Sequence, residues 1–209
     1  MLNKEILNQN RVLTMSNNRK GDYLIINNII DESRKRNSVI VMVIIDNNIS
    51  KDIIFIKQID INNYIEEVLD IYKEFNICKK IVIDINGYGN CLYEELEQYI
   101  KPSDKIEKVI NIGLPTYIIP NIINDINFGK LRFLQSSNCA KVSYRKPFLG
   151  YYEIMNSHRE TDKLIDEIDN VDIVCTTNGS IKLDFKNKKI GHSRFYCLHS
   201  YYAILLDND

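Results

Sequence analysis

The chain has 209 residues, with 27 basic and 28 acidic side chains and a formal net charge of −1. This length supports one large domain with a full core, and the balanced charge argues against a globally basic nucleic-acid-binding protein. Any DNA contact must therefore come from local basic clusters. The apolar runs are too short to span a membrane, and the five cysteines form no CxxC pair, which indicates neither a zinc site nor a disulfide framework.

The first half of the chain alternates apolar runs with polar turns. Residues 1–21 are polar and predict a flexible arm or linker, which leaves 22–209 for a single domain. Apolar segments and the turns between them predict an antiparallel three-strand meander over 23–31, 38–45 and 52–60. The pattern then predicts a helix over 62–76 capped by Asn62, a strand over 80–85 and a helix over 90–100.

The second half is less regular. Its patterns predict a strand over 109–114, a helix over 119–133 that stops at Gly129, a helix that begins near Thr161, a hairpin of 172–177 with 180–185, and a closing helix over 194–206. This element order is α/β. It resembles the ribonuclease H-like arrangement, a mixed sheet of three antiparallel strands and then helix-linked parallel strands, flanked by helices. A C-terminal hairpin and a closing helix complete it.

Two carboxylates end strands that this arrangement places side by side. Asp31 ends the first strand, and Asp84 ends the fourth, directly before the Gly87-x-Gly89 turn. Open α/β sheets bind ligands at such strand ends, and two carboxylates at close range resist ionising without a cation. Mg²⁺ or Mn²⁺ meets this need, and two such ions hold a phosphodiester during in-line displacement. The alternative is that Asp84 only caps the turn.

Several passages together resemble the C-terminal nuclease domain of the large terminase subunit of tailed bacteriophages. The passages are DESRKRNSVIV, YIEEVLDIYKEFNICKKIVIDINGYGNCLYEEL, FGKLRF, TDKLIDEIDNV, SIKLDF and KKIGHSRFYCLHSYYAIL. The likeness covers roughly residues 22–206, and the order and spacing of the passages carry it. RuvC-type resolvases share the sheet and fit the later half less well.

The resemblance implies three acids, of which Asp31 matches the first and Asp84 the second. The third opens the closing helix in the family, and Ser193 stands there, followed by a fitting Arg194. A hydroxyl contributes less to a dication site than a carboxylate, so this departure from the family pattern weakens the expected site. His192 is a candidate metal ligand or proton carrier, and a surface turn histidine is its alternative. Asp184 is a further candidate, with a solvated strand edge as its alternative.

Basic residues beside these positions are candidate DNA contacts. The candidates are Arg34, Lys35, Arg36, Arg145, Lys146, Lys188, Lys189 and Arg194. Phosphate contacts would give salt-sensitive binding that tolerates any DNA sequence. For the loop beside Asp31 the alternative is a solvated turn.

The leading hypothesis is a Mg²⁺- or Mn²⁺-dependent endodeoxyribonuclease, with two ions expected, that cuts concatemeric DNA during packaging. The resemblance implies double-stranded DNA as substrate and the cytoplasm of an infected or lysogenic bacterial host as location. An ATPase motor domain, the small terminase subunit and the portal are the implied protein partners. The second hypothesis is a DNA-binding or docking module that has lost cleavage, supported by Ser193. A third is an unrelated nucleotide-binding domain, against which the absence of any phosphate-binding loop counts.

Overall fold

A computed structural model describes residues 3–14, 20–31, 36–102, 105–110, 118–143, 151–175, 181–187 and 192–207. Its helices are α1 (Lys4–Gln9), α2 (Tyr64–Glu74), α3 (Gly89–Tyr99), α4 (Ile119–Asn127), α5 (Ser137–Ser143), α6 (Tyr151–Asp169) and α7 (Ser193–Asp207), with a 3₁₀ turn at Ile61–Asn63. Its strands are β1 (Tyr23–Asp31), β2 (Arg36–Asp46), β3 (Lys51–Asp60), β4 (Lys80–Asp84), β5 (Ile106–Val109), β6 (Leu131–Arg132), β7 (Val171–Cys175) and β8 (Ile181–Phe185). Within these ranges no helix is long and apolar enough to cross a membrane.

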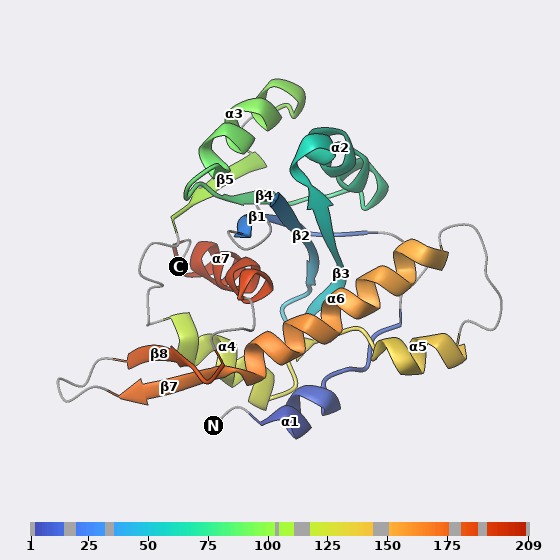
Figure 1. Cartoon of the computed structure of the whole chain (residues 1–209), viewed down its shortest axis with the longest axis vertical. Helices are drawn as coiled ribbons and strands as arrows, with labels where there is room; N and C mark the ends of the chain where they lie inside the picture. Colours follow the sequence, from blue (N-terminus) through green and yellow to red (C-terminus); the bar gives the residue numbers. More distant parts are fainter. Residues whose placement is uncertain are drawn as a thin grey trace.

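The central sheet has the strand order β5-β4-β1-β2-β3-β6 (Figure 1). The strands β1, β2 and β3 form an antiparallel meander, and β4 lies parallel to β1 on one side and to β5 on the other. A separate two-stranded sheet is made by β7 and β8 and projects from the body of the molecule. The predicted α/β fold, with its three antiparallel strands, helix-linked parallel strands, hairpin and closing helix, is confirmed.

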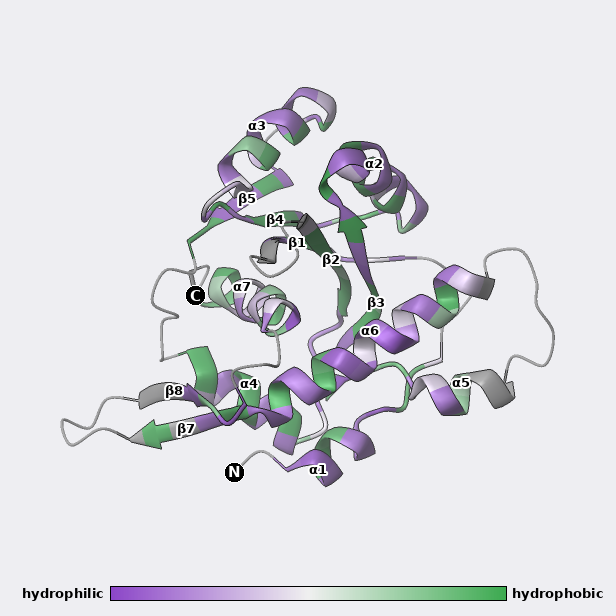
Figure 2. Cartoon of the chain, viewed as in Figure 1, coloured by the Kyte–Doolittle hydropathy of each residue, from purple (hydrophilic) through white to green (hydrophobic). Residues whose placement is uncertain are grey.

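Alternate residues of the central strands enter two separate cores. Leu24, Ile26 and Ile83 pack on the face that α2 and α3 cover. Ile25 and Val82 pack on the opposite face against α7, α6 and α4. Because both faces are covered, β1, β2 and β4 are apolar on both sides. Figure 2 shows them as hydrophobic strands, and the helices around them carry hydrophilic residues.

The helix α7 packs on the sheet along β1, between the sheet and the helices α4 and α6 (Figure 1). Phe195, Leu198 and Tyr201 on this helix are almost fully buried, and so is Cys197. A helix with neighbours on several sides needs apolar residues around most of its circumference. The predicted apolar closing helix is therefore confirmed, with Ser193 as its first residue.

The predicted flexible arm is wrong for the residues described within it. Lys4–Gln9 form α1, and Leu7 is fully buried in the core against α4 and α6. Leu13 then forms a β-bridge with Leu134, and the guanidinium of Arg11 pairs with Asp162. Short helices have little stability in isolation, so α1 depends on tertiary contacts. The local sequence does not predict these contacts.

Three predicted boundaries in the second half also differ from the structure. The helix of 119–133 ends at Asn127, and Leu131–Arg132 instead form β6, which pairs with the first residues of β3. The strand expected over 109–114 is β5, which ends at Val109, and 111–117 lie outside the described residues. The helix expected from Thr161 begins at Tyr151, and the Thr161 hydroxyl donates to the Ser157 carbonyl at 2.9 Å within the helix instead of capping it.

Candidate functional site

Asp84 ends β4 in a buried position on the α7 side of the sheet. It is 5% exposed, and its Oδ1 accepts hydrogen bonds from the Asn86 backbone N–H at 3.1 Å and the Asn86 side-chain amide at 2.7 Å. Burial raises the pKa of Tyr196 on α7, and the negative charge of Asp84 raises it further. The carboxylate therefore lies near α7, held by the turn that follows its own strand.

The Gly-x-Gly turn sets the path of the chain directly after Asp84. Gly87 has φ +58°, in the left-handed region that favours glycine. A Cβ on Gly89 would lie 1.8 Å from the carbonyl oxygen of Asp84, so no other residue fits there without movement. The first turn of α3 consequently packs against the end of β4, and this contact holds Asp84 in place.

The residue of β1 that lies level with Asp84 is Asn27. The last registered pair of these parallel strands is Ile26 with Ile83, and Asn27 and Asp84 are the next residues on each strand. Registered neighbours in parallel strands point to the same face. Asn27 is 4% exposed, and its amide donates to the Ser193 carbonyl at 3.4 Å. The structure thus gathers Asn27, Asp84 and Ser193 at one point, from β1, β4 and α7.

Asp31 does not lie level with Asp84. The strands are side by side as predicted, but Asp31 is four residues further along β1 than Asn27, about 13 Å at the usual strand rise. The two strand ends are therefore not level with each other, and the expected meeting of the two carboxylates stays a prediction. The side chain of Asp31 lies outside the described ones, so its own role stays a prediction. Tyr23 and Lys80, the first residues of β1 and β4, form the first registered pair of the two strands. Counting four residues along each strand from this pair would have identified Asn27 as the neighbour of Asp84.

Ser193 opens the closing helix, as the resemblance implies, and His192 directly precedes it. The ring of His192 stacks on Phe185 of β8 with centroids 3.6 Å apart, and it meets Tyr196 edge-on at 6.5 Å. These contacts tie the hairpin to the start of α7. The metal or proton role predicted for His192 is not tested by this stacking. Asp184, the further candidate, is exposed on the hairpin, and its carboxylate accepts from the Phe185 backbone at 2.9 Å.

Arg194 is a structural residue in this fold. It is 7% exposed, its Nε donates to Glu160 at 2.7 Å, and its Nη1 donates to Glu167 at 2.7 Å. Its Nη2 donates to Glu160 and, at 3.3 Å, to Gln58. The prediction that Arg194 contacts DNA is wrong, because two buried carboxylates of α6 already occupy its guanidinium.

Glu167 was not anticipated as a functional residue, although it fixes the start of α7. Its Oε2 accepts from the backbone N–H groups of Arg194 at 2.8 Å and Phe195 at 2.9 Å. These groups have no partner within the helix, so an acceptor from α6 caps it. Burial raises the pKa of Glu167, and burial lowers that of Arg194, but the charges of Glu160 and Glu167 outweigh this and raise it. The seven-residue spacing of the two glutamates on one helix face was the available signal.

The other predicted DNA contacts lie outside the described side chains. Arg34, Lys35, Arg145, Lys146, Lys188 and Lys189 belong to segments that the structure does not describe. Arg36 is described only as backbone, where it pairs with Asp31 across β1 and β2. Their contact with DNA stays a prediction.

The donor set at this point does not fit a site for two divalent ions. Two-ion phosphodiester chemistry uses several carboxylates, because Mg²⁺ and Mn²⁺ prefer anionic oxygen ligands. Of the three positions gathered here, Asp84 alone supplies a carboxylate, with an amide at Asn27 and a hydroxyl at Ser193. Among the side chains that the structure describes, no three His, Cys, Asp or Glu residues stand close enough to hold a metal.

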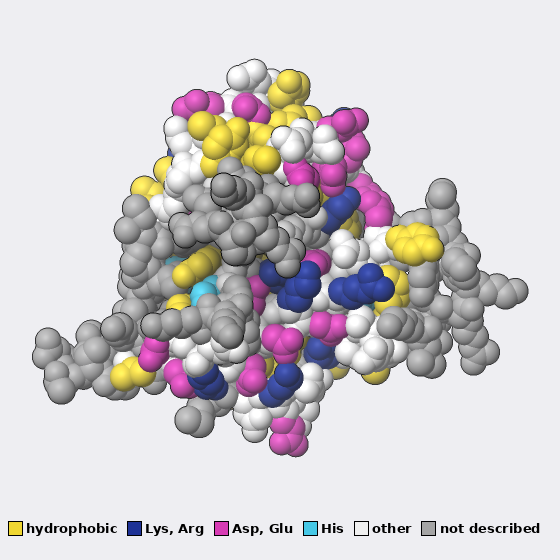
Figure 3. Space-filling model, in the orientation of Figure 1, with side chains coloured by type: hydrophobic (Ala, Val, Ile, Leu, Met, Phe, Trp, Pro, Cys, Tyr) yellow, Lys and Arg dark blue, Asp and Glu magenta, His cyan; other side chains and the backbone are white. Residues whose placement is uncertain are grey.

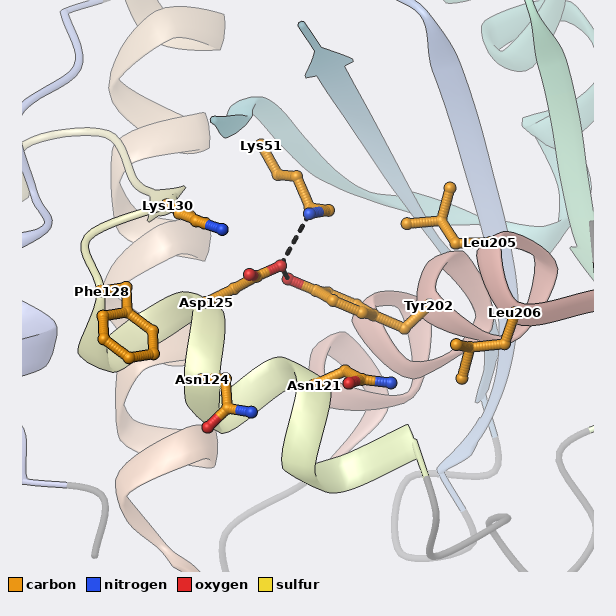
Figure 4. Close-up of a pocket in the computed structure, with 9 residues that line it drawn as sticks. All are labelled: Lys51, Asn121, Asn124, Asp125, Phe128, Lys130, Tyr202, Leu205 and Leu206. Atoms are coloured by element: carbon orange, nitrogen blue, oxygen red, sulfur yellow. Dashed lines mark hydrogen bonds and ion pairs between the residues drawn. The ribbon is translucent and has the colours of Figure 1, made fainter. Parts of the chain in front are cut away.

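A pocket of about 400 Å³ lies between α4 and α7, beside the start of β3 (Figure 4). There Asp125 Oδ2 accepts from Lys51 Nζ at 2.7 Å and from the Tyr202 hydroxyl at 2.7 Å. Burial and the Asp125 charge raise the pKa of Tyr202. These charged groups satisfy one another and join β3 to both helices, which is a structural arrangement.

Comparison with solved structures identifies the class of fold. The large terminase nuclease from thermophilic phage G20c with bound magnesium aligns with a TM-score of 0.53 and 13% identity, over 88% of this chain and 84% of that one. The manganese-soaked human cytomegalovirus terminase nuclease domain aligns at 0.54 and 11%, over 100% and 96%. The HK97 bacteriophage large terminase aligns at 0.54 and 9%, over 97% of this chain and 43% of that one. No protein-family model and no curated protein matches the sequence.

The molecule therefore has the ribonuclease H-like fold. Within that class, its fold is that of the nuclease domains of large terminases, and the resemblance noted from the sequence is confirmed at this level.

Proposed function

We propose that this chain is the nuclease-fold domain of a DNA-packaging terminase in which cleavage is weakened or lost. The fold similarity extends over nearly the full length of isolated terminase nuclease domains, which supports the terminase assignment. In this role the domain binds double-stranded DNA in the cytoplasm of a bacterial host, beside the motor that moves the DNA.

One observation is the main support for a weakened metal site. Asn27 lies level with Asp84, at a position where a metal site needs a second carboxylate. Ser193, at the start of α7, offers a hydroxyl in place of a third. A hard cation held by one carboxylate and neutral oxygens binds more weakly than one held by several carboxylates. The two neutral positions are adjacent, because the Asn27 amide donates to the backbone carbonyl of Ser193.

The alternative function is a metal-dependent endonuclease that cuts concatemeric DNA with Mg²⁺ or Mn²⁺ held by Asp31 and Asp84. The buried carboxylate of Asp84 at the end of β4 favours it, and so do the terminase nuclease domains whose structures hold magnesium or were soaked in manganese. Under this alternative Asp31 must approach Asp84 from four residues beyond its level on β1.

The test restores the missing carboxylates. The double variant Asn27→Asp with Ser193→Asp should bind Mn²⁺ at least about tenfold more tightly than the unchanged chain by calorimetry. It should also gain Mn²⁺-dependent nicking of supercoiled plasmid, and adding Asp84→Asn should abolish both gains. The unchanged chain should shift duplex DNA in a gel while nicking it slowly or not at all.

Three results would decide against parts of this proposal. Rapid nicking by the unchanged chain that is lost in both Asp84→Asn and Asp31→Asn would establish the endonuclease of the alternative. A double variant that folds but binds Mn²⁺ no better would refute the role given to Asn27 and Ser193. Failure of the unchanged chain to bind duplex DNA would remove the packaging role altogether.

A further inference from the structure

A groove of about 410 Å³ lies between α2 and α3, on the face of the sheet opposite α7. Its apolar lining comes from Ile65, Leu69 and Tyr99. Tyr99 is 62% exposed at the end of α3, although an aromatic ring of this size gains considerably from burial. The groove thus offers apolar surface to something outside the chain.

The walls of the groove are tied together. Tyr64 of α2 is 5% exposed, and its hydroxyl donates to the carboxylate of Glu95 on α3. Burial raises the pKa of Tyr64, and the hydrogen bond to Glu95 and its charge raise it further. The bond keeps a carboxylate at the rim of the groove in a fixed position, so the groove exists before any partner arrives.

The two helices that form the groove are strongly acidic. Their acidic residues are Glu66, Glu67, Asp70 and Glu74 in α2 and Glu94, Glu95 and Glu97 in α3, against Lys73 as the one basic residue within these two helices. Figure 3 shows hydrophobic side chains gathered over α3, with acidic side chains beside them and over α2. The whole chain has a net charge of only −1, so this acidity is local.

Two of these carboxylates line the groove itself, Glu66 and Glu95. Glu67 pairs with Lys57 of β3 at 2.9 Å, and Glu97 accepts from Tyr93 at 2.7 Å, so both are engaged within the fold. An apolar channel edged by carboxylates attracts Lys and Arg side chains and repels phosphate. The groove therefore fits neither nucleic acid nor an anionic membrane surface.

We propose that the α2–α3 groove docks a basic amphipathic helix of a partner protein. An amphipathic helix places apolar residues in such a groove at helical spacing while its basic residues meet the rim. Here the apolar residues would contact Leu69 and Tyr99, and the basic residues would meet Glu66 and Glu95. This proposal does not depend on nuclease or DNA-binding activity, since it concerns the opposite face of the sheet.

The experiment uses the full chain and a fluorescent synthetic peptide of leucine and lysine with amphipathic helical spacing. Fluorescence anisotropy should show saturable binding. Tyr99→Ser and Glu66→Lys should each weaken it by about tenfold, as expected for an anchor residue and for reversal of a rim charge. A peptide of the same composition in scrambled order should bind at least about tenfold more weakly than the amphipathic one.

Matched controls come from α6, where Tyr152 is 82% exposed and Glu153 is also exposed. Tyr152→Ser and Glu153→Lys should leave binding unchanged. Equal binding of the scrambled peptide, or equal losses of binding in the control variants, would show that general charge attraction holds the peptide. Either result would refute docking in the α2–α3 groove. Thermal melts check that each variant folds. If Tyr99→Ser does not fold, Glu66→Lys still tests the groove, because Glu66 is exposed.

Discussion

The carboxylate of Glu167 binds Arg194 twice, through the backbone N–H at 2.8 Å and through the guanidinium at 2.7 Å. The first contact caps α7, and the second neutralises an arginine that the fold buries. Because Ser193 directly precedes Arg194, this one carboxylate of α6 sets where the closing helix begins and therefore how it meets Asn27.

Replacement of Glu167 should destabilise the protein strongly. Glu167→Gln leaves Arg194 with Glu160 as its one carboxylate partner, and breaking a buried ion pair in this way costs about 3 kcal/mol. Urea unfolding should show this loss. Glu153→Gln is the matched control, since its pair with Lys57 is exposed and its loss should cost less than about 1 kcal/mol. Equal effects of the two changes would contradict the role given to Glu167.

A side chain at Gly89 should disturb both the fold and the Asp84 position. The Cβ of Gly89→Ala would lie 1.8 Å from the Asp84 carbonyl oxygen, so the strand end or α3 must move, at a cost on the order of 3 kcal/mol. Gly129→Ala should cost only about 1 kcal/mol from its φ of +67°, because its Cβ would meet nothing closer than 3.7 Å. Chemical denaturation of both variants measures the two losses of unfolding free energy. Similar losses would contradict the close contact assigned to Gly89.

Stability should fall as the pH drops through the range just below 6.5, because of His158. This residue is 1% exposed, with Nδ1 at 2.8 Å from the Gln135 carbonyl, and burial lowers its pKa from 6.5. Between the lowered folded pKa and 6.5 the unfolded chain binds more protons than the folded one, so stability rises with pH there. Above 6.5 this contribution is fully present.

The variant His158→Asn isolates this effect, since its amide can replace the Nδ1 donor without titrating. Urea midpoints measured across this pH range should decline less steeply for the variant than for the unchanged chain. Parallel declines would assign the pH dependence to other groups.

Removal of the Tyr202 hydroxyl should weaken the junction of α4 and α7 drawn in Figure 4. Tyr202→Phe deletes the donor to Asp125 while Lys51 remains paired with the same oxygen, so we expect a loss of about 1 kcal/mol. Tyr152→Phe, at an 82% exposed ring, should have no measurable effect. Thermal unfolding compares the two, and an unchanged midpoint for Tyr202→Phe would contradict the assignment.

The strands and most helices followed from sequence because their signals are local. The run 23–31 matches β1 at both ends, and β7 and β8 pair on either side of Asn178-Gly179 as expected. What failed depends on distant partners. The two residues of β6 become a strand only by pairing with Lys51 and Asp52 of β3, and α1 is held by the burial of Leu7.

The site was predicted in part for the same reason. Asp84 and Ser193 were identified from local pattern and resemblance, but the neighbour of Asp84 depends on the register of two strands that differ in length. An asparagine inside β1 carries no signal of its own until that register is known. Arg194 looked like a DNA contact because its two carboxylate partners come from a helix 34 and 27 residues earlier.

The closing helix runs along β1, from the level of Asn27 back to Tyr23 at the start of the strand. Its 15 residues span about 22 Å, so Ser193 meets Asn27 at one end while Tyr202 holds Asp125 near the other. A packed helix shifts along its axis as a rigid rod, and a lengthwise displacement therefore moves both junctions together. Any displacement of α7 along its axis would therefore change both the Asn27 contact and the Asp125 contact.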